Sequence, residues 1–315
     1  MLRSSVSTLL GIQYPVLQGG MAWIADATLA AAVSEAGGLG VISAMGSDCE
    51  RLRAEIRKAK KLTDKPFGVN IMLMSSGVEQ TADLVCEEGV PVVTTGAGNP
   101  AKYMDRWLQA DIKVVPVVAS VAFARLMERI GAHAVIAEGG EAGGHVGDSS
   151  TMTLVPQVCD AVRIPVIAAG GIGDGRGLAA SMMLGASGVQ LGTRFLLAKE
   201  CGIHDVYKQK LIKASDIATI VTGRRSGHPI RTLKSPMARR YAEWEYDSNV
   251  DDKALSELRA GGLRKAVEEG SESEGYFMAG QIAGMLKREE TAQQIVHSIV
   301  AEAEELFKRC GTWLE

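Results

Sequence analysis

His145 stands within the glycine-rich run GGEAGGHVG at residues 139–147. An imidazole can give or take a proton near neutral pH, which makes it a common acid–base group in enzymes. Glycine is costly to order and has no side chain to pack, so five glycines in nine residues indicate main chain that passes close to another group. The run therefore predicts a catalytic histidine, with an exposed loop histidine as the alternative.

Two further glycine-rich runs have the composition of an anion site. AAGGIGDGRG (168–177) and SGVQLGTRF (187–195) each follow an apolar stretch, and each is expected to open a helix. Backbone N–H groups at helix N-termini bind anions, and glycine lets a phosphate come close. A single pocket of this kind suits a mononucleotide or a sugar phosphate. The alternative to a phosphate site is that these glycines only form a tight turn. The predicted phosphate contacts are Gly171, Gly173, Gly192 and Thr193.

Several polar residues interrupt stretches that are otherwise apolar. Asn70 lies inside FGVNIML, while Gln18 and Glu138 lie at the ends of similar stretches, and Gln281 lies in MAGQIAG. A buried amide or carboxyl must find a partner. For Asn70, a bound ring system and the neighbouring main chain are both open as that partner.

These residues need elements that hold them in place, and the chain has a repeated pattern of a short apolar run followed by a helical stretch. The runs are rich in valine and isoleucine, as in parallel strands that are covered on both faces. Eight such strands predict a (β/α)8 barrel, whose functional residues sit at the C-terminal ends of the strands. An open doubly wound sheet is the alternative, but the count of eight and the lack of an early GxGxxG favour the barrel. The runs cover residues 14–20, 38–44, 66–73, 90–96, 112–118, 132–139, 164–171 and 187–193.

The rhythm of strands and helices stops near residue 200. We expect the barrel over residues 1–199, a polar and mainly helical insertion or lid over 200–275, and a C-terminal segment over 276–315 that closes back on the barrel. The last part of that segment, 288–310, has the pattern of a long helix.

Composition excludes some classes of function. With 34 basic and 37 acidic residues the net charge is -3, so neither nucleic acid nor an anionic membrane is an expected partner. No apolar run reaches the ~18 residues of a membrane helix, and the N-terminus lacks the pattern of a signal peptide. Five scattered cysteines without metal-site spacing fit reduced thiols, so we expect a cytoplasmic protein without a metal site.

The motifs together resemble a known group of flavoenzymes. YPVLQGGMAW, KPFGVNIML, AVIAEGGEAGGHVG, IPVIAAGGIGDG and VQLGTRF are similar to the flavin-dependent enoyl-acyl-carrier-protein reductases, which belong with the nitronate monooxygenases (2-nitropropane dioxygenases). The resemblance implies FMN across the barrel mouth and His145 as the active-site histidine. It also implies ring contacts from Gln18, Gly20, Met21, Asn70, Glu138 and Gln281, and phosphate contacts from Gly171, Gly173, Gly192 and Thr193.

The same resemblance implies a reaction. The expected function is reduction of trans-2-enoyl-acyl-carrier-protein thioesters by NADH or NADPH in bacterial fatty-acid synthesis. The alternative is oxidation of nitroalkanes or nitronates with FMN and dioxygen, in which His145 is the base. Expected partners are the enoyl thioester, acyl carrier protein and a second copy of the chain in a homodimer. Four basic residues of the insertion are expected to bind a cofactor phosphate or the acidic carrier, and the alternative is a solvated charged face. They are Arg224, Arg225, Arg231 and Lys234.

Overall fold

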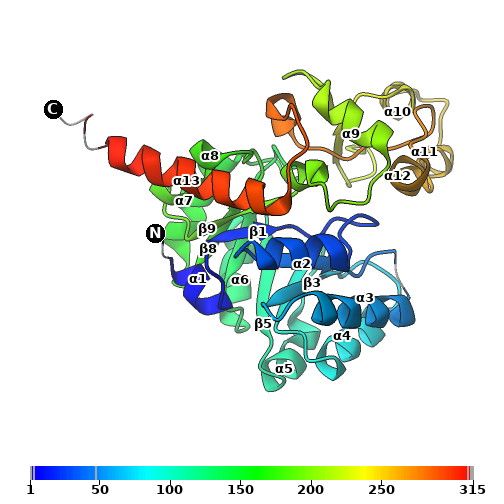
Figure 1. Cartoon of the computed structure of the whole chain (residues 1–315). Helices are drawn as coiled ribbons and strands as arrows, with labels where there is room; N and C mark the ends of the chain where they lie inside the picture. The colour runs from blue at the N-terminus through cyan, green and yellow to red at the C-terminus, as the bar shows by residue number, and fades with distance from the viewer. Residues whose placement is uncertain (1, 3, 47, 311, 313–315) are drawn as a thin grey trace.

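The chain forms a closed barrel of eight parallel strands (Figure 1). The computed structural model describes residues 2, 4–46, 48–310 and 312. The strand order is β1-β9-β8-β6-β5-β4-β3-β2, and a bridge between Leu17 and Leu39 brings the first strand beside the second. The predicted (β/α)8 barrel is therefore confirmed. The strands are β1 (Val16–Gln18), β2 (Gly40–Ser43), β3 (Phe67–Met72), β4 (Val92–Gly96), β5 (Lys113–Val118), β6 (Val135–Glu138), β8 (Val166–Ala169) and β9 (Gly188–Leu191).

Branched apolar side chains explain why these segments form a barrel. Alternate residues of each strand point inward, where Leu17, Val41, Val115 and Ile136 pack into one buried cluster. The other faces pack against the outer helices. Helix α1 (Ser5–Leu10) adds buried residues to the inner cluster, so the barrel interior is a filled core and not a channel.

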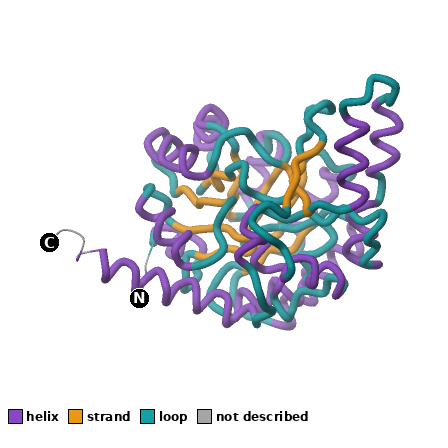
Figure 2. Tube along the Cα trace, turned by 90° about the horizontal axis from the view of Figure 1, so that it is seen from above, coloured by secondary structure: helices purple, strands orange, loops and turns teal. Residues whose placement is uncertain are grey.

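Helices between the strands cover the outside of the barrel (Figure 2). Asp26 is the N-cap of the first of them, because its carboxylate accepts a hydrogen bond from the Leu29 N–H at 2.9 Å. Gly37, with a φ of 90°, follows the end of that helix. The covering helices are α2 (Ala27–Glu35), α3 (Cys49–Leu62), α4 (Val78–Glu87), α5 (Ala101–Gln109), α6 (Val121–Arg129), α7 (Thr151–Ala161) and α8 (Gly175–Met183).

The eighth helical position is filled from a distant part of the chain. After β9 the expected helix is only a 3-10 turn, η1 (Thr193–Leu197), because the chain leaves the barrel for the insertion. Helix α13 (Ala292–Cys310) then returns and packs between α8 and α2 (Figure 1). It begins four residues later than the sequence pattern indicates, after a loop in which Ala198 pairs with Glu290.

The insertion contains a small sheet that the sequence pattern does not predict. Strands β10 (Thr219–Thr222) and β11 (Ile230–Leu233) form an antiparallel pair, and β7 (Gly144–His145) joins them as the third strand. The histidine loop of the barrel is therefore part of the insertion's sheet. The other elements are α9 (Asp205–Ile212), α10 (Pro236–Glu245), α11 (Asp252–Arg259), α12 (Gly262–Arg264), the π-helical turn η2 (Lys265–Glu269) and the 3-10 turn η3 (Gln281–Met285).

Two further properties concern the length of the apolar helices and the state of the cysteines. Within the described residues, no helix is both long and apolar enough to span a bilayer. All five cysteines are described, and each carries a free thiol.

Candidate active site

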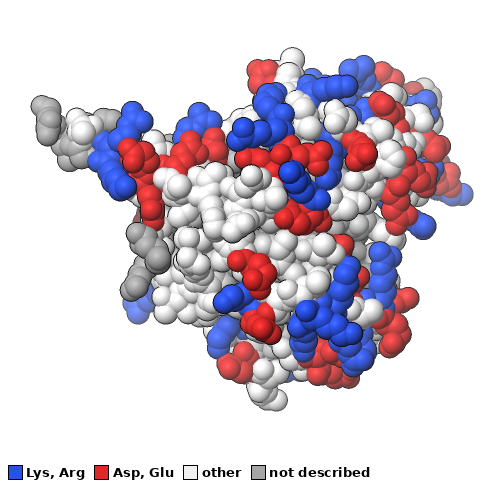
Figure 3. All heavy atoms as spheres, viewed as in Figure 1, with Lys and Arg blue, Asp and Glu red and all other residues white. Residues whose placement is uncertain are grey.

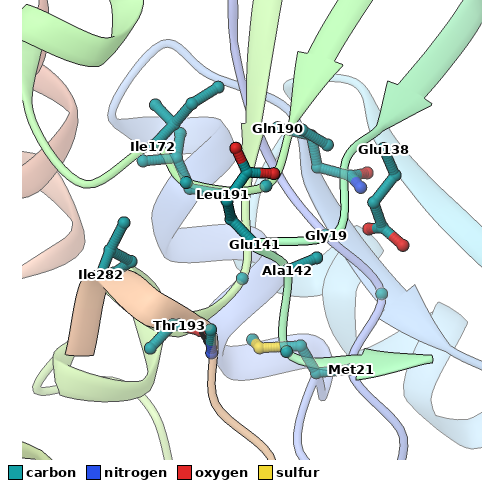
Figure 4. A pocket seen from close by; sticks show the side chains of 17 residues that line it. Gly19, Met21, Glu138, Glu141, Ala142, Ile172, Gln190, Leu191, Thr193 and Ile282 are labelled. Atoms are coloured by element: carbon teal, nitrogen blue, oxygen red, sulfur yellow. Dashed lines mark hydrogen bonds between the residues drawn. The ribbon is translucent and has the colours of Figure 1, made fainter. Parts of the chain in front are cut away.

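A cleft of two connected chambers opens where the strands end. Five residues line both chambers: Gly20, Met21, Glu138, Gly143 and Gln190. We call the first the glycine chamber, because seven of its seventeen lining residues are glycines (Figure 4). Its other lining residues include Glu141, Gly170, Gly171, Gly192, Thr193, Gly280 and Ile282. The second, the histidine chamber, is completed by Ser43, Met45, Asn70, Met72, Gly144, His145, Leu263 and Met278, among others.

The glycine chamber has the shape expected of a phosphate cradle. Gly170 and Gly171 have φ angles of 89° and 73°, a left-handed conformation that favours glycine. Of the residues predicted to contact a phosphate, Gly171, Gly192 and Thr193 line the chamber, whereas Gly173 lies outside it beside Ile282. These residues bring backbone from the loops after β8 and β9 to one place.

The first turn of helix α8 offers fewer free backbone N–H groups for binding an anion than the sequence suggests. Glu302 accepts a hydrogen bond from the Gly175 N–H at 2.7 Å, and Asp174 accepts one from the Arg176 N–H at 3.0 Å. Because carboxylates already occupy these N–H groups, an anion in the chamber would depend on the loop and not on the first turn of the helix.

Asn70 and Gly20 form a close contact on the floor of the histidine chamber. A Cβ added to Gly20 would lie 2.2 Å from the Cβ of Asn70, so only glycine fits there. The Asn70 Oδ1 accepts a hydrogen bond from the Thr94 hydroxyl at 2.9 Å. In the described part of the chain the Asn70 amide nitrogen donates no hydrogen bond, which leaves this donor for a bound molecule.

Glu138 places a carboxyl at the junction of the two chambers. Burial raises its pKa from the ordinary 4.5 to about 7. No hydrogen-bond partner of this carboxyl exists among the described residues. Gln190, on the same side of the chamber in Figure 4, was not predicted as a site residue. Its signal was present, since it is a polar residue within the apolar run SGVQLGT, as Asn70 is in its own strand.

Gln18 and Gln281 do not take the places that were predicted for them. The Gln18 side chain is fully buried, and it bonds to the main chain of Val41 at 3.0 and 3.2 Å and to the Gly19 carbonyl. Because those bonds satisfy its amide, Gln18 joins β1 to β2 outside the cleft. Gln281 has an exposed side chain that lines neither chamber, and its backbone N–H donates to the Glu141 carbonyl at 2.9 Å.

His145 projects into the histidine chamber from a short strand. Its backbone pairs with Ile230 of β11, and the next residue, Val146, donates its N–H to the Pro229 carbonyl at 3.1 Å. Burial lowers the pKa of the imidazole, and the positive charge of Arg259 and the neighbouring His228 lower it further. The lowered pKa favours the neutral form of the ring, which can accept a proton or donate one N–H hydrogen bond.

The glycines beside His145 allow close packing of protein against protein. A Cβ on Gly143 would lie 2.6 Å from both the Ala279 carbonyl carbon and the Gly280 nitrogen, and one on Gly140 would lie 2.8 Å from the Gly147 carbonyl oxygen. The Thr193 hydroxyl accepts a hydrogen bond from the Gly280 N–H at 2.8 Å. The histidine loop, the loop after β9 and the C-terminal segment thus lock together.

Most of the basic residues singled out in the insertion have structural partners. Arg231 donates to the Gly140 carbonyl at 2.9 Å, Arg224 pairs with Asp148 at 3.5 Å, and Arg225 pairs with Asp252 at 3.0 Å. These contacts hold the insertion and the histidine loop in place. Lys234 differs, because it is exposed and makes no ion pair among the described residues.

Replacing Arg259 with glutamine is expected to raise the pKa of His145 toward its ordinary value of 6.5. The substitution removes a positive charge that opposes protonation of the imidazole. A pH titration of the His145 ring by NMR measures the change, and Arg224→Gln is the matched control because Arg224 is not among the causes of the shift. An equal pKa in the native protein and in Arg259→Gln would contradict this assignment.

Comparison with known proteins gives a consistent group. The model of the family described as nitronate monooxygenase matches residues 3–84 and 74–302. The structure of FabK from Thermotoga maritima is 48% identical and superposes with a TM-score of 0.97, covering 99% of this chain and 100% of that one.

Two relatives of known sequence carry different names. A hydroxy-methyl-oxo-octahydroindene-carboxyl-CoA dehydrogenase of Mycobacterium tuberculosis is 35% identical, covering 96% of each chain. A probable nitronate monooxygenase of Staphylococcus saprophyticus is 34% identical, covering 98% of this chain and 99% of the relative. All of these relatives are oxidoreductases, so this protein is an oxidoreductase as well.

Proposed function

The chain belongs to the nitronate monooxygenase family, and we propose that it is an FMN-dependent reductase of trans-2-enoyl thioesters that uses NADH or NADPH. The observation that supports this choice within the family is the likeness to FabK at 48% identity over nearly the whole chain. The carboxyl-CoA dehydrogenase relative acts on a thioester as well, according to its name.

The cleft fits FMN, the cofactor on which the nitronate monooxygenase and FabK families depend. Gly171, Gly192 and Thr193 would hold the phosphate in the glycine chamber. Gly20 and Asn70 offer a flat wall and an unused amide donor where the ring would lie. When bound, FMN supplies a centre that accepts a hydride from the nicotinamide and passes it to the substrate.

The side chains of the histidine chamber handle charge and protons. As the β-carbon of an enoyl thioester takes a hydride, negative charge develops on the thioester oxygen. His145 donates an N–H hydrogen bond to that oxygen, and the α-carbon then takes a proton to complete the saturated thioester. The Glu138 carboxyl, which keeps its proton up to about pH 7, supplies that proton and regains one from water. Leu263 and Met278 give this chamber two apolar side chains against which the substrate can pack.

Steady-state assays test the proposal. The FMN-loaded protein is expected to oxidise NADH or NADPH in the presence of a crotonyl thioester and to release the saturated butyryl thioester. Consumption of the nicotinamide without formation of butyryl thioester would contradict it.

Nitronate oxidation is the second candidate function, and the likeness to a probable nitronate monooxygenase at 34% identity favours it. A neutral imidazole is ready to take the α-proton of a nitroalkane, as a base must be. In that case propyl nitronate would drive rapid oxygen uptake without NADH or NADPH, and no crotonyl thioester would be reduced.

Replacing Glu138 with glutamine is expected to stabilise the protein at alkaline pH. The folded protein holds the Glu138 proton up to about pH 7, whereas the unfolded chain releases it near 4.5, so ionisation lowers stability as the pH rises between these values. Glutamine carries no such charge. Urea unfolding at about pH 5 and about pH 8 should show a gain for Glu138→Gln at the higher pH only. The exposed Glu243→Gln is the control, and an equal pH dependence of both variants would refute the assignment.

A further inference from the structure

A basic groove lies on the insertion, outside the cleft already described. It is lined by Lys210, Lys213, Lys234 and Arg239 together with Ala214, Ser215, Ile217, Ala218 and Leu233, and none of its lining residues is acidic. Figure 3 shows lysine and arginine side chains over the insertion at the top of that view, with acidic side chains among them. We call this surface the basic groove.

The cations of the basic groove are largely uncompensated. Lys210 pairs with Glu272 at 2.6 Å, but Lys213, Lys234 and Arg239 are exposed and take part in no ion pair among the described residues. Lys287 adds a further charge at the edge, where its amine donates to the Ala214 carbonyl at 2.8 Å. Asp216 is exposed nearby but does not line the groove. On a chain whose net charge is -3, this is a local concentration of positive charge.

A second groove on helix α3 shows what a basic surface looks like when its own chain neutralises it. Arg53 pairs with Glu87 at 2.9 Å and with Glu88 at 2.7 Å, and Arg57 pairs with Glu88 at 2.8 Å. The basic groove has one such partner, Glu272, which pairs with Lys210 and lies near enough to Lys213 to interact with its charge, whereas Lys234 and Arg239 have none among the described residues. It also has an exposed apolar residue among its lining, since Ile217 is 69% exposed. Exposed cations around an exposed apolar residue form a typical surface for an acidic protein partner.

The fold joins the basic groove to the cleft. Leu233 lines the groove at one end of β11, and Ile230 at the other end pairs with His145. The two ends are three residue steps apart along the strand, which is about 10 Å at roughly 3.3 Å per residue. On the other side, a Cβ on Gly284 would touch the backbone of Ser215, and Ile282 of the same 3-10 turn lines the glycine chamber. A partner on the groove would therefore lie beside the cleft.

From this arrangement we propose that the basic groove is the docking surface for the carrier that presents the enoyl thioester, a small acidic acyl carrier protein whose flexible arm reaches the histidine chamber. Lys213, Lys234 and Arg239 contact its acidic side chains, and Ile217 packs against an apolar residue between them. This inference rests on the proposed function, because the carrier is needed only if the substrate is a thioester.

The test compares one enoyl group on two carriers. The double variant Lys213→Glu/Lys234→Glu is assayed in the FMN-loaded protein with crotonyl-acyl carrier protein and with the uncharged crotonyl-N-acetylcysteamine. We expect the KM for the carrier-borne substrate to rise about tenfold or more, with kcat unchanged and with no change for the small thioester. The matched control is Lys58→Glu/Lys61→Glu, which reverses two charges in the groove on α3. An unchanged KM for the carrier-borne substrate, or an equal change in the control, would overturn the proposal.

Direct binding keeps the two proposals separable. Fluorescence anisotropy of labelled holo-acyl carrier protein should show binding to the native protein that weakens with added salt and is lost in Lys213→Glu/Lys234→Glu. If neither thioester is reduced, the proposed function fails. The anisotropy measurement still tests whether the basic groove binds acyl carrier protein. Absence of binding, equal binding by both proteins, or preferential binding of RNA or anionic vesicles would overturn the docking surface.

Discussion

Replacing His145 with alanine is expected to lower kcat for enoyl-thioester reduction by about 100-fold or more, while the protein remains loaded with FMN. The imidazole stands on the wall of the histidine chamber, away from the glycine chamber that would hold the phosphate. Its loss removes the hydrogen bond to the developing negative charge but no predicted cofactor contact. Rapid-mixing kinetics should therefore show normal flavin reduction by the nicotinamide and slow reoxidation by the thioester.

His297 provides the control for this variant. It lies on α13 against Tyr14, far in sequence from the cleft, and it lines neither chamber. His297→Ala should keep the native kcat. Full turnover by His145→Ala with bound FMN would remove the histidine from the mechanism.

Replacing Gly143 with alanine is expected to destabilise the protein by about 1–3 kcal/mol and to weaken FMN binding. The added methyl group would lie 2.6 Å from backbone atoms of Ala279 and Gly280, which have no rotamer through which to move away. The histidine loop and the C-terminal segment must separate, and Gly143 lines both chambers. Urea unfolding measures the stability, and quenching of flavin fluorescence measures the affinity.

The control for Gly143→Ala is Gly202→Ala. A Cβ on Gly202 meets no atom within 4 Å, and Gly202 does not have a positive φ. We expect little change in stability or in FMN affinity for that variant. Equal effects of the two substitutions would show that the close contact at Gly143 is not the cause of the lost stability and FMN affinity.

The barrel was predictable because each unit depends on local pattern. Runs such as IPVIAAGG and IKVVPVV are apolar on both faces, and only strands that are covered on both faces satisfy that pattern. The ends of those runs carry polar and glycine residues, so the sequence pattern directs Asn70, Glu138, Gly171, Thr193 and His145 to the strand ends, and all five line the cleft.

The contacts between distant segments were not predictable in this way. Strand β7 has two residues, and its partner Ile230–Arg231 lies far along the chain, so no local periodicity marks the pairing. Gln18 shows a related limit, because a glutamine that bonds to main chain and one that faces a ligand look alike in sequence. Arg259 acts on His145 only because the insertion folds back over the cleft.

Reoxidation of the reduced flavin by an enoyl thioester tests the central claim most directly. The FMN-loaded protein is first reduced under anaerobic conditions with NADH or NADPH and is then mixed with crotonyl-acyl carrier protein, while the flavin absorbance is followed. The account predicts that the oxidised flavin spectrum returns with formation of butyryl-acyl carrier protein. A flavin that stays reduced until dioxygen is admitted would contradict the reductase assignment.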